Sequence, residues 1–367
     1  MKKIYVLLIS LLVVASCAKD NVAIDEVETL GKGKIYATIH DDDDTRVQLN
    51  ESMQTVWTAG DVINIYGPKS YGLYKFDGQT GDRVGVFSLN KEYTPIKDKV
   101  TKYFAVYPGQ SEIDYSQSTA KNSELITYLQ HNQTYVEGSY SPDANVMLGS
   151  SDDGSSYYFK NLVSYLRVSI TGSRAVRSID FFGNNKEIVA GKLYVNSDNA
   201  TASFRGDDVE AKRKITLDCG EEGVQLSETP QEFYIVVPAI VYSKGFSVVV
   251  NFTDGTAFPK STGKSRAFGK NYIQPMQVFS TDVDNWQNAY IYHYGKKIVM
   301  PKAGGGAVLG CVIWGDGNST LYGQETSDEY EYTDGEESHI VTVQVAGAVE
   351  LTIGSCLGIS KIDLSNF

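Results

Sequence analysis

The fold of this chain is decided by residues 56–66, Val56-Trp57-Thr58-Ala59-Gly60-Asp61-Val62-Ile63-Asn64-Ile65-Tyr66. Large apolar side chains stand on both sides of a Gly-Asp pair, and this dipeptide is typical of tight turns. The pattern predicts a strand, a tight corner and a second strand. The composition agrees, because 25 Tyr and 14 Phe accompany few runs of strong helix formers, so we expect an all-β protein.

Other segments with alternating or apolar sequence also predict strands, and each is bounded by Gly, Asn, Asp or Pro. Their near-regular spacing favours β-sandwiches with Greek-key connections. Only the segment around residues 123–130 favours a short helix. The strands predicted outside residues 56–66 and before residue 283 include 34–39, 165–170, 179–182, 192–195, 215–217, 233–237 and 246–252.

The first seventeen residues have the layout of an export signal. Lys2 and Lys3 precede an apolar run, residues 4–14, that is short for a membrane span. The sequence Val14-Ala15-Ser16-Cys17 looks like a bacterial lipobox, which implies cleavage before Cys17 and lipid on its sulfur. Two or three acyl chains would anchor the protein stably. An ordinary secretory signal and a single membrane helix are the alternatives for this segment.

Charge and cysteine content narrow the classes of partner and site. The formal net charge is −12 and becomes more negative once the two lysines of the signal are removed, so nucleic acids are poor partners. Three cysteines besides Cys17 are too few and too widely spaced for a disulfide scaffold or a Cys-x-x-Cys metal site. A single bridge between Cys311 and Cys356 and buried free thiols both remain open; the third cysteine is Cys219.

No pattern of catalytic or metal-binding residues stands out. The sequence has no nucleophile elbow, phosphate loop or dinucleotide fingerprint, and its four histidines are far apart. Acidic pairs are interpreted as surface charge, the run of four aspartates at 41–44 as a solvated loop, and Gly315-Asp316-Gly317 as a turn; calcium is the minor alternative for the last two. We therefore expect no enzyme, no cofactor and no metal site. The histidines are His40, His131, His293 and His339.

An ordered set of short segments resembles the fimbrillin-like family, which contains major, minor and anchor subunits of type V pili. The set opens with Thr45-Arg46 and continues through the Trp-x-x-Gly-Asp stretch quoted above. The similarity covers roughly residues 33–282. Its further members are Tyr103-Phe104-Ala105-Val106-Tyr107-Pro108, Asn145-Val146-Met147-Leu148-Gly149, residues 159–168, residues 233–239 and Phe268-Gly269-Lys270-Asn271-Tyr272.

The resemblance implies a fold and a mode of assembly. The fold is two tandem transthyretin-like Greek-key β-sandwiches. In polymerising members an arginine-specific protease removes the first strand, and a strand of another subunit fills the groove that is left. Here Arg46 would be the processing site and residues 34–39 the strand removed. The alternative is that Arg46 simply precedes a strand.

The pattern changes after Asp282. Residues 286–302 read as an aromatic strand pair, residues 303–307 as a flexible hairpin or hinge, and residues 338–345 as a strand. Residues 312–317 resemble the Trp-Gly-Asp-Gly corner of PKD-type Ig-like modules. Residues 359–366 look like one degenerate leucine-rich repeat, which fits an edge strand or cap because a single repeat has no neighbour on which to bury its face. The predicted core of this module is Ile313, Trp314, Val341, Val343 and Leu351.

These segments predict five parts of the chain. The polar stretch 150–156 is taken as the boundary between the two sandwiches. The module after residue 282 would block donation of the preceding strands and leave one usable connection. The parts are a signal peptide (1–16), a tether (17–32), an N-terminal β-sandwich (33–155), a second β-sandwich (156–282) and a small C-terminal β module (286–367).

We therefore expect a non-enzymatic lipoprotein exposed on the cell outer membrane or in a fimbrium, acting as a tip or accessory pilus subunit in cell adhesion. Its partners would be the membrane, other pilus subunits through strand exchange, and a surface protein or glycan of a host or bacterium. The alternative function is a glycan-binding lipoprotein serving polysaccharide uptake. Four aromatic residues are candidates for contacts with such a ligand, although core packing explains the same rings equally well; they are Trp286, Tyr290, Tyr292 and Trp314.

Overall fold

A computed structural model describes residues 33–39, 55–67, 71–92, 102–109, 124–282, 286–316, 318–322, 327–354 and 357–367. Strands make up all the regular structure in these residues apart from one short 3₁₀ turn, η4 (Pro142–Ala144). The predicted all-β class is therefore confirmed. The same residues contain no long apolar helix of the kind that crosses a bilayer. Cys17, His40, residues 41–44, Arg46 and Cys356 lie outside the described residues.

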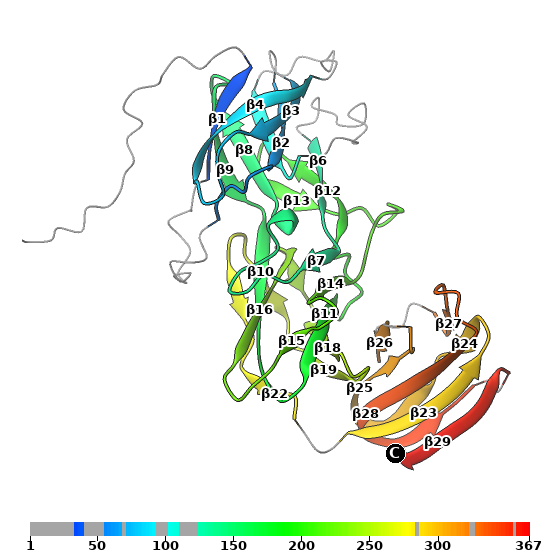
Figure 1. Cartoon of the computed structure of the whole chain (residues 1–367). Helices are drawn as coiled ribbons and strands as arrows, with labels where there is room; N and C mark the ends of the chain where they lie inside the picture. The colour runs from blue at the N-terminus through cyan, green and yellow to red at the C-terminus, as the bar shows by residue number, and fades with distance from the viewer. Residues whose placement is uncertain are drawn as a thin grey trace, which may run out of the picture. The chain divides into compact units, whose positions relative to one another are not determined.

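The first unit is a closed barrel of seven strands, not an open sandwich (Figure 1). It closes because the first strand pairs antiparallel with the fourth and parallel with the last. A closed barrel leaves no strand edge, whereas a sandwich leaves four. In spatial order the strands are β1 (Lys34–Ile39), β4 (Val84–Glu92), β3 (Tyr71–Phe76), β2 (Val62–Tyr66), β5 (Tyr103–Tyr107), β8 (Met147–Ser151) and β9 (Ser156–Asn161).

Trp57 fills the centre of the barrel. Its side chain is fully buried, and its ring meets Phe87 edge-on at 4.9 Å and Phe159 at 5.2 Å between centroids. The corner that follows needs a glycine, since Gly60 has a φ of 98°, in the left-handed region. The predicted corner and the strand that follows it, β2, thus contribute to the core of the first unit, whereas the strand predicted before the corner is wrong, because residues 55–58 do not lie in a strand.

Two strands between β5 and β8 leave the barrel and join the sheets of the second unit. β6 (Glu124–Leu129) pairs with β12 (Gly191–Asn196), and β7 (Asn132–Thr134) pairs with β14 (Ile215–Asp218). The helix predicted around residues 123–130 is therefore wrong. The residues from Leu125 to Thr127 are all buried, which a strand covered on both faces requires and an amphipathic helix does not.

The second unit is a β-sandwich with an additional sheet. One sheet has the order β16-β10-β21, with β22 also on β10, and the other has the order β19-β18-β11-β14-β7, with β15 also on β11. Their facing residues form one core, and β12, β13 and β6 form the third sheet. The strands not yet bounded are β10 (Val163–Thr171), β11 (Ala175–Gly183), β13 (Thr201–Ser203), β15 (Val224–Gln225), β16 (Gln231–Pro238), β17 (Val241–Tyr242), β18 (Phe246–Phe252), β19 (Ala257–Thr262), β20 (Arg266–Ala267), β21 (Ile273–Pro275) and β22 (Phe279–Ser280).

The boundary between the first two units differs from the one predicted at residues 150–156. That stretch is the turn of the β8–β9 hairpin, and both strands belong to the barrel. The barrel therefore continues to Asn161. Barrel and sandwich also share a buried cluster, in which Tyr66 and Leu148 of the barrel lie with Tyr165 and Val236 of the sandwich. The two units are joined by a continuous apolar core, which polar linker composition alone did not reveal.

The C-terminal module is a five-stranded sheet in the order β26-β25-β28-β23-β29, with a separate β24–β27 pair. Residues 303–307, predicted as a hinge, lie inside the long strand β25, where irregular pairing with β28 accommodates the glycines. The predicted edge strand at 359–366 is confirmed as β29. The bounds are β23 (Gln287–Tyr294), β24 (Lys297–Val299), β25 (Lys302–Ile313), β26 (Ser319–Leu321), β27 (Glu329–Glu331), β28 (Ser338–Thr352) and β29 (Ile359–Asn366).

The core of this module differs in one residue from the prediction. Trp314, Val341 and Val343 are buried in it and Leu351 packs against it. Ile313 points the other way and packs with Cys311 and Leu321 against three residues of the second sandwich. Successive residues of a strand face opposite sides, so Val312 and Ile313 serve different cores. The sandwich residues in the shared cluster are Phe182, Val249 and Ala257.

Candidate functional site

The first strand is held in the barrel by backbone pairing on both of its edges. Residues 34–38 pair with β4, and residues 36–39 pair with β9. Further bonds fix its ends: the Ile39 amide donates to the Arg83 carbonyl at 3.0 Å, and the Leu89 amide donates to the Gly33 carbonyl at 2.9 Å. β1 is therefore the single strand that joins β4 to β9, and without it the barrel would be open along one side.

The inward side chains of β1 complete the barrel core. Ile35, Ala37 and Ile39 alternate with outward residues and are all buried. They pack in the cluster that contains Trp57, whose indole N–H donates to the Ala37 carbonyl at 3.1 Å. The groove that loss of β1 would leave is thus apolar, with a backbone edge on each side, which is the arrangement that accepts a strand from another chain.

The buried carboxylate of Asp61 accepts hydrogen bonds in the corner after Trp57. Asp61 accepts a hydrogen bond from the Thr58 amide at 2.7 Å and another from the Tyr107 hydroxyl at 3.1 Å. Burial raises the pKa of Asp61 to about 6, with a smaller contribution from the charge of Asp143 and partial compensation by the two donors. Asp61 therefore titrates above the usual carboxyl range, and the stability of the barrel should depend on pH as a result.

The substitution Asp61→Asn tests this coupling. The pKa of Asp61 is higher in the folded state than the ordinary 3.8, so the folded state holds the proton more tightly. The contribution of Asp61 to the free energy of unfolding is complete below about pH 4 and is lost as the pH rises through 6. The change is about 3 kcal/mol, because a difference of one pKa unit corresponds to about 1.4 kcal/mol. Urea unfolding from pH 4 to 7.5 should show this loss in the parent and not in the variant. Equal pH slopes in both proteins would exclude Asp61 as the cause.

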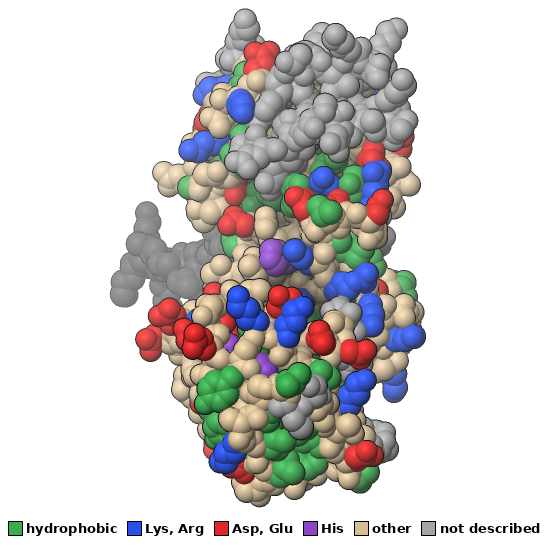
Figure 2. Space-filling model, turned by 90° about the vertical axis from the view of Figure 1, so that its right-hand side faces the viewer, with side chains coloured by type: hydrophobic (Ala, Val, Ile, Leu, Met, Phe, Trp, Pro, Cys, Tyr) green, Lys and Arg blue, Asp and Glu red, His purple; other side chains and the backbone are tan. Residues whose placement is uncertain are grey.

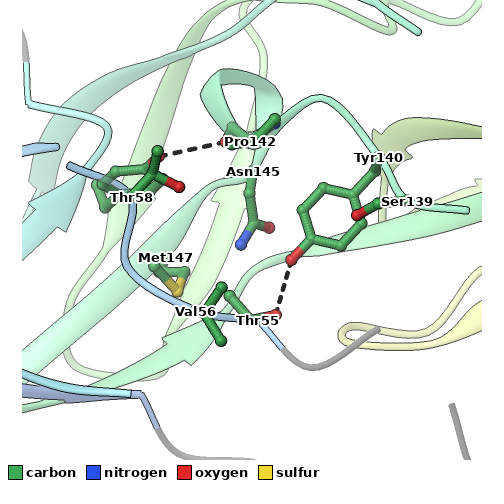
Figure 3. Close-up of a pocket in the computed structure, with 9 residues that line it drawn as sticks. Thr55, Val56, Thr58, Ser139, Tyr140, Pro142, Asn145 and Met147 are labelled. Carbon is green, nitrogen blue, oxygen red and sulfur yellow. Dashed lines mark hydrogen bonds between the residues drawn. The ribbon is translucent and has the colours of Figure 1, made fainter. Parts of the chain in front are cut away.

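A small polar cavity lies beside this corner. Figure 3 shows the Asn145 carboxamide pointing into it between Thr55, Met147 and Tyr140. The Asn145 oxygen accepts a bond from the Tyr165 hydroxyl at 2.9 Å, while its amide nitrogen has no hydrogen-bond partner among the described residues. The cavity volume is about 50 Å³, far below the roughly 300–1,000 Å³ of small-molecule sites. The cavity suits ordered solvent and does not suit an organic ligand.

Two of the four candidate aromatic residues are core residues. Trp314 is 1% exposed, lies parallel to Tyr330 at 4.2 Å, and donates its indole N–H to the Thr320 hydroxyl at 2.8 Å. Trp286 packs against the core of the second sandwich, with its ring 5.4 Å from that of Phe258. The alternative of core packing therefore applies to both, fully for the buried Trp314 and in part for the half-buried Trp286.

The other two candidates lie on an open face of the C-terminal sheet. Tyr290 and Tyr292 are half-buried and alternate along β23 with residues of the module core, and Tyr294 continues the row at 57% exposure. Ile340 lies opposite Tyr292 on β28 and is also exposed. The Lys361 ammonium on β29 sits 4.9 Å from the Tyr292 ring centroid. Figure 2 shows hydrophobic side chains gathered towards the lower end of one face of the molecule.

The structure brings together two histidines that the sequence separates. His293 and His339 are cross-strand partners on β23 and β28, and both are buried. The His339 ring stacks on Tyr332 at 3.6 Å, and its Nε2 lies 2.9 Å from an Asp334 oxygen. Burial lowers the pKa of His293, and the bond from His339 lowers that of Asp334. Only the register of two strands 46 residues apart places these rings together, so no sequence motif could have found the pair.

None of these groups forms a metal centre within the described ranges. No set of three or more His, Cys, Asp or Glu residues there is placed to hold an ion. Asp316 of the predicted turn instead accepts hydrogen bonds from the Tyr330 hydroxyl and the Asn318 side chain and amide. Cys219 and Cys311 are free thiols, and burial raises the pKa of each to about 12, so both stay protonated at neutral pH.

Several solved structures resemble much of the chain at low sequence identity. A "putative cell adhesion protein" from Bacteroides ovatus ATCC 8483 is 10% identical, with a TM-score of 0.42, and the match covers 67% of this chain and 91% of that chain. Another "putative cell adhesion protein", from Bacteroides uniformis ATCC 8492, is 14% identical, with a TM-score of 0.38 and coverages of 68% and 92%.

A fimbrial protein from Bacteroides ovatus ATCC 8483 is 12% identical, with a TM-score of 0.32 and coverages of 71% and 52%. No protein-family model and no curated protein matches the sequence. All three TM-scores lie below 0.5, so the function proposed below rests on the residues of this chain.

Proposed function

We propose that this chain is a non-enzymatic, surface-displayed lipoprotein that acts as a tip or accessory subunit of a pilus in cell adhesion. Lipid on Cys17 holds it at the outer membrane until a protease cuts after Arg46. The cut separates β1 and the anchor from the rest of the barrel. A strand of a neighbouring subunit then takes the place of β1 between β4 and β9 and completes the barrel core.

The observation that carries this proposal is the position of β1. The strand closes the barrel alone, its three inward residues complete the core, and it lies between Cys17 and Arg46 in the sequence. After a cut at Arg46, only non-covalent contacts would retain it. A replacement strand needs apolar residues at the three inward positions, because their burial contributes about 25 cal/mol for each Å² of apolar surface.

The C-terminal module supports a place at the end of a pilus. The last strands of the second sandwich, β21 and β22, pair with the central strand β10. The chain then continues into Trp286, which packs back on Phe258, and into a module that shares a buried cluster with the same sandwich. Strands tied at both ends are poor donors to a neighbour, so the subunit offers one connection, the groove of β1.

Cleavage by an arginine-specific protease tests this function. We expect the first cut in the full chain to fall at Arg46 and to yield a barrel that joins other subunits, since the sequence places Arg46 in a polar acidic stretch beyond β1. Arg46→Gln should block both the cut and the assembly, whereas Arg266→Gln, which removes an exposed arginine of the second sandwich, should block neither. Mass spectrometry of the fragments and electron microscopy of the products measure the two effects. Assembly by the uncut Arg46→Gln protein would contradict the proposal.

The tyrosine row on β23 favours a second candidate, a glycan-binding lipoprotein for polysaccharide uptake. Tyr290, Tyr292 and Tyr294 lie on β23, on the sheet face that contacts the second sandwich through residues of β25 and β26. Aromatic rings with a polar rim stack against sugar rings. This candidate needs no strand exchange, so cleavage at Arg46 would leave it unaffected.

A further inference from the structure

A groove of about 610 Å³ opens where the two sheets of the second sandwich meet at their edges. Its walls come from the end strands β19 and β21, from the short strand β20, and from Phe246 at the start of β18. The volume lies within the range of about 300–1,000 Å³ that small-molecule sites have. No residue of this groove was a candidate site residue in the sequence, and the groove is separate from the tyrosine row of the C-terminal module.

The charge of the groove is opposite to that of the protein. Lys260, Lys264 and Arg266 line it, and none of the residues that line it is acidic. The three side chains are exposed, and no carboxylate of the described residues forms an ion pair with any of them. In a chain with a net charge of −12, three cations without counter-charges around one groove make a local anion-attracting field.

Hydrogen bonds hold the backbone of the wall that carries these cations. The side-chain nitrogen of Asn184 donates to the Lys244 carbonyl at 3.1 Å and to the Thr262 carbonyl at 3.0 Å, which connects the end of β19 to the neighbouring turn. The turn and the end of β19 can lie this close together because residue 245 is glycine. At its φ of 76°, a Cβ atom would lie 1.8 Å from the Thr262 carbonyl oxygen. A fixed wall lowers the entropic cost of binding, because Lys264 and Arg266 are attached to backbone that is already in place.

The remaining lining suits a saccharide. Gln274 and Gln277 offer amide donors and acceptors for hydroxyl groups, and the half-buried Met276 offers a limited apolar surface for the C–H face of a sugar ring. Arginine pairs with carboxylate or sulfate through two parallel hydrogen bonds, and lysine adds a point charge. Cations beside amides and a limited apolar surface are the groups that an acidic sugar needs.

An extended acidic peptide fits less well. Peptides that add to a sheet edge depend on unpaired backbone N–H groups. Proline lacks this donor, and each end strand contains one, Pro259 in β19 and Pro275 in β21. The side chains of this groove, and not its backbone edges, therefore supply most of its binding groups.

We propose that this groove binds an acidic saccharide, a segment of a carboxylated or sulfated polysaccharide, through Lys264 and Arg266 with Lys260 beside them. The site is independent of strand exchange and lies on a different unit from the barrel groove. It would give the displayed protein a ligand on a neighbouring surface or in the surrounding matrix, where such polymers occur.

Calorimetric titration of the full chain, made soluble by Cys17→Ser, tests this site. The probes are a sulfated heparin hexasaccharide, an oligogalacturonate and neutral maltohexaose. We expect at least one acidic probe to bind and the neutral one not to bind, with an affinity that falls as salt is added. The double variant Lys264→Gln/Arg266→Gln should weaken binding by about tenfold or more. The matched double variant Lys102→Gln/Lys297→Gln, which removes two exposed lysines elsewhere, should change it by less than about twofold.

Several outcomes would overturn this proposal. One is the absence of binding by either acidic probe at millimolar concentration. Another is equal weakening of binding by the two double variants, which would mean that binding depends only on the net charge of the protein. A third is aggregation of Lys264→Gln/Arg266→Gln without loss of binding, which would assign the cations to protection of the sheet edges. Binding of a synthetic Asp-rich peptide in place of the saccharides would also exclude it. Arg266→Lys should recover part of the affinity, because it restores the charge without the paired hydrogen bonds.

Discussion

Replacing Trp57 by alanine is expected to lower the free energy of unfolding of the barrel by about 3–5 kcal/mol. The side chain is fully buried among Phe87, Phe159 and Tyr107, so its removal leaves a large cavity that rigid strands cannot fill. The Ala37 carbonyl, which pairs with β4 in the barrel, also loses the indole N–H as a second donor, which adds the cost of one buried hydrogen bond. Urea unfolding, with hydrogen exchange of peptides from β1, measures the loss.

Two further variants separate the contributions of the ring and of the hydrogen bond. Trp57→Phe keeps most of the packing but cannot donate to Ala37, so we expect a smaller loss, about 1–3 kcal/mol, with faster exchange of β1 amides. Val84→Ala removes an exposed side chain of the same barrel and should change stability by about 0.5 kcal/mol or less. If the urea midpoint of Trp57→Ala equalled that of Val84→Ala, Trp57 would not be a main source of the stability of the barrel.

Removing residues 286–367 is expected to destabilise the second sandwich by about 3 kcal/mol or more, since uncovering a buried Val or Phe side chain costs about 1.5–3 kcal/mol. Phe182 and Val249 would lose their cover from the module, and the core would lose Trp286 beside Phe258. The sequence alone predicted an independent module, for which the melting of the sandwich would not change. Thermal unfolding of the truncated chain decides between the two expectations.

Point variants at neighbouring positions provide a matched control. Ile313→Asp places a charge in the cluster shared with the sandwich and should weaken docking while the module keeps its own core. Val312→Asp places the same charge inside the core of the module and should unfold it. Unchanged stability of the sandwich in both Ile313→Asp and the truncated chain would show that the shared cluster contributes nothing.

Local patterns predicted much of the fold. The first strand, the Trp57 corner and the strands of the second sandwich are all present, because alternation and turn residues are local signals. The edge strand at the C-terminus was also predicted. Closure of the barrel was not, because β1 and β9 are more than a hundred residues apart and no local signal sets their pairing.

The wrong predictions have identifiable physical causes. Leu125 and Leu129 are spaced like one face of a helix, yet pairing of β6 with β12 overrides that preference. The glycines of residues 303–307 favour a hinge, but an irregular strand also tolerates them. Trp314 directly follows the end of β25 and its ring is buried, whereas Tyr292 lies on the outward face of β23 and is half-buried, and neither outcome follows from the local sequence. The groove of Lys264 and Arg266 joins residues from four strands and has no sequence signature.

The central claim, that β1 is replaceable, can be tested directly by strand exchange in solution. The Cys17→Ser chain is cut with an arginine-specific protease and mixed with an excess of isotope-labelled peptide spanning residues 33–46. Native mass spectrometry then follows the mass of the barrel. We predict that the labelled strand replaces β1 in the cut protein and not in uncut Arg46→Gln. A cut protein that retains its own β1 indefinitely and takes up no labelled strand would contradict the account.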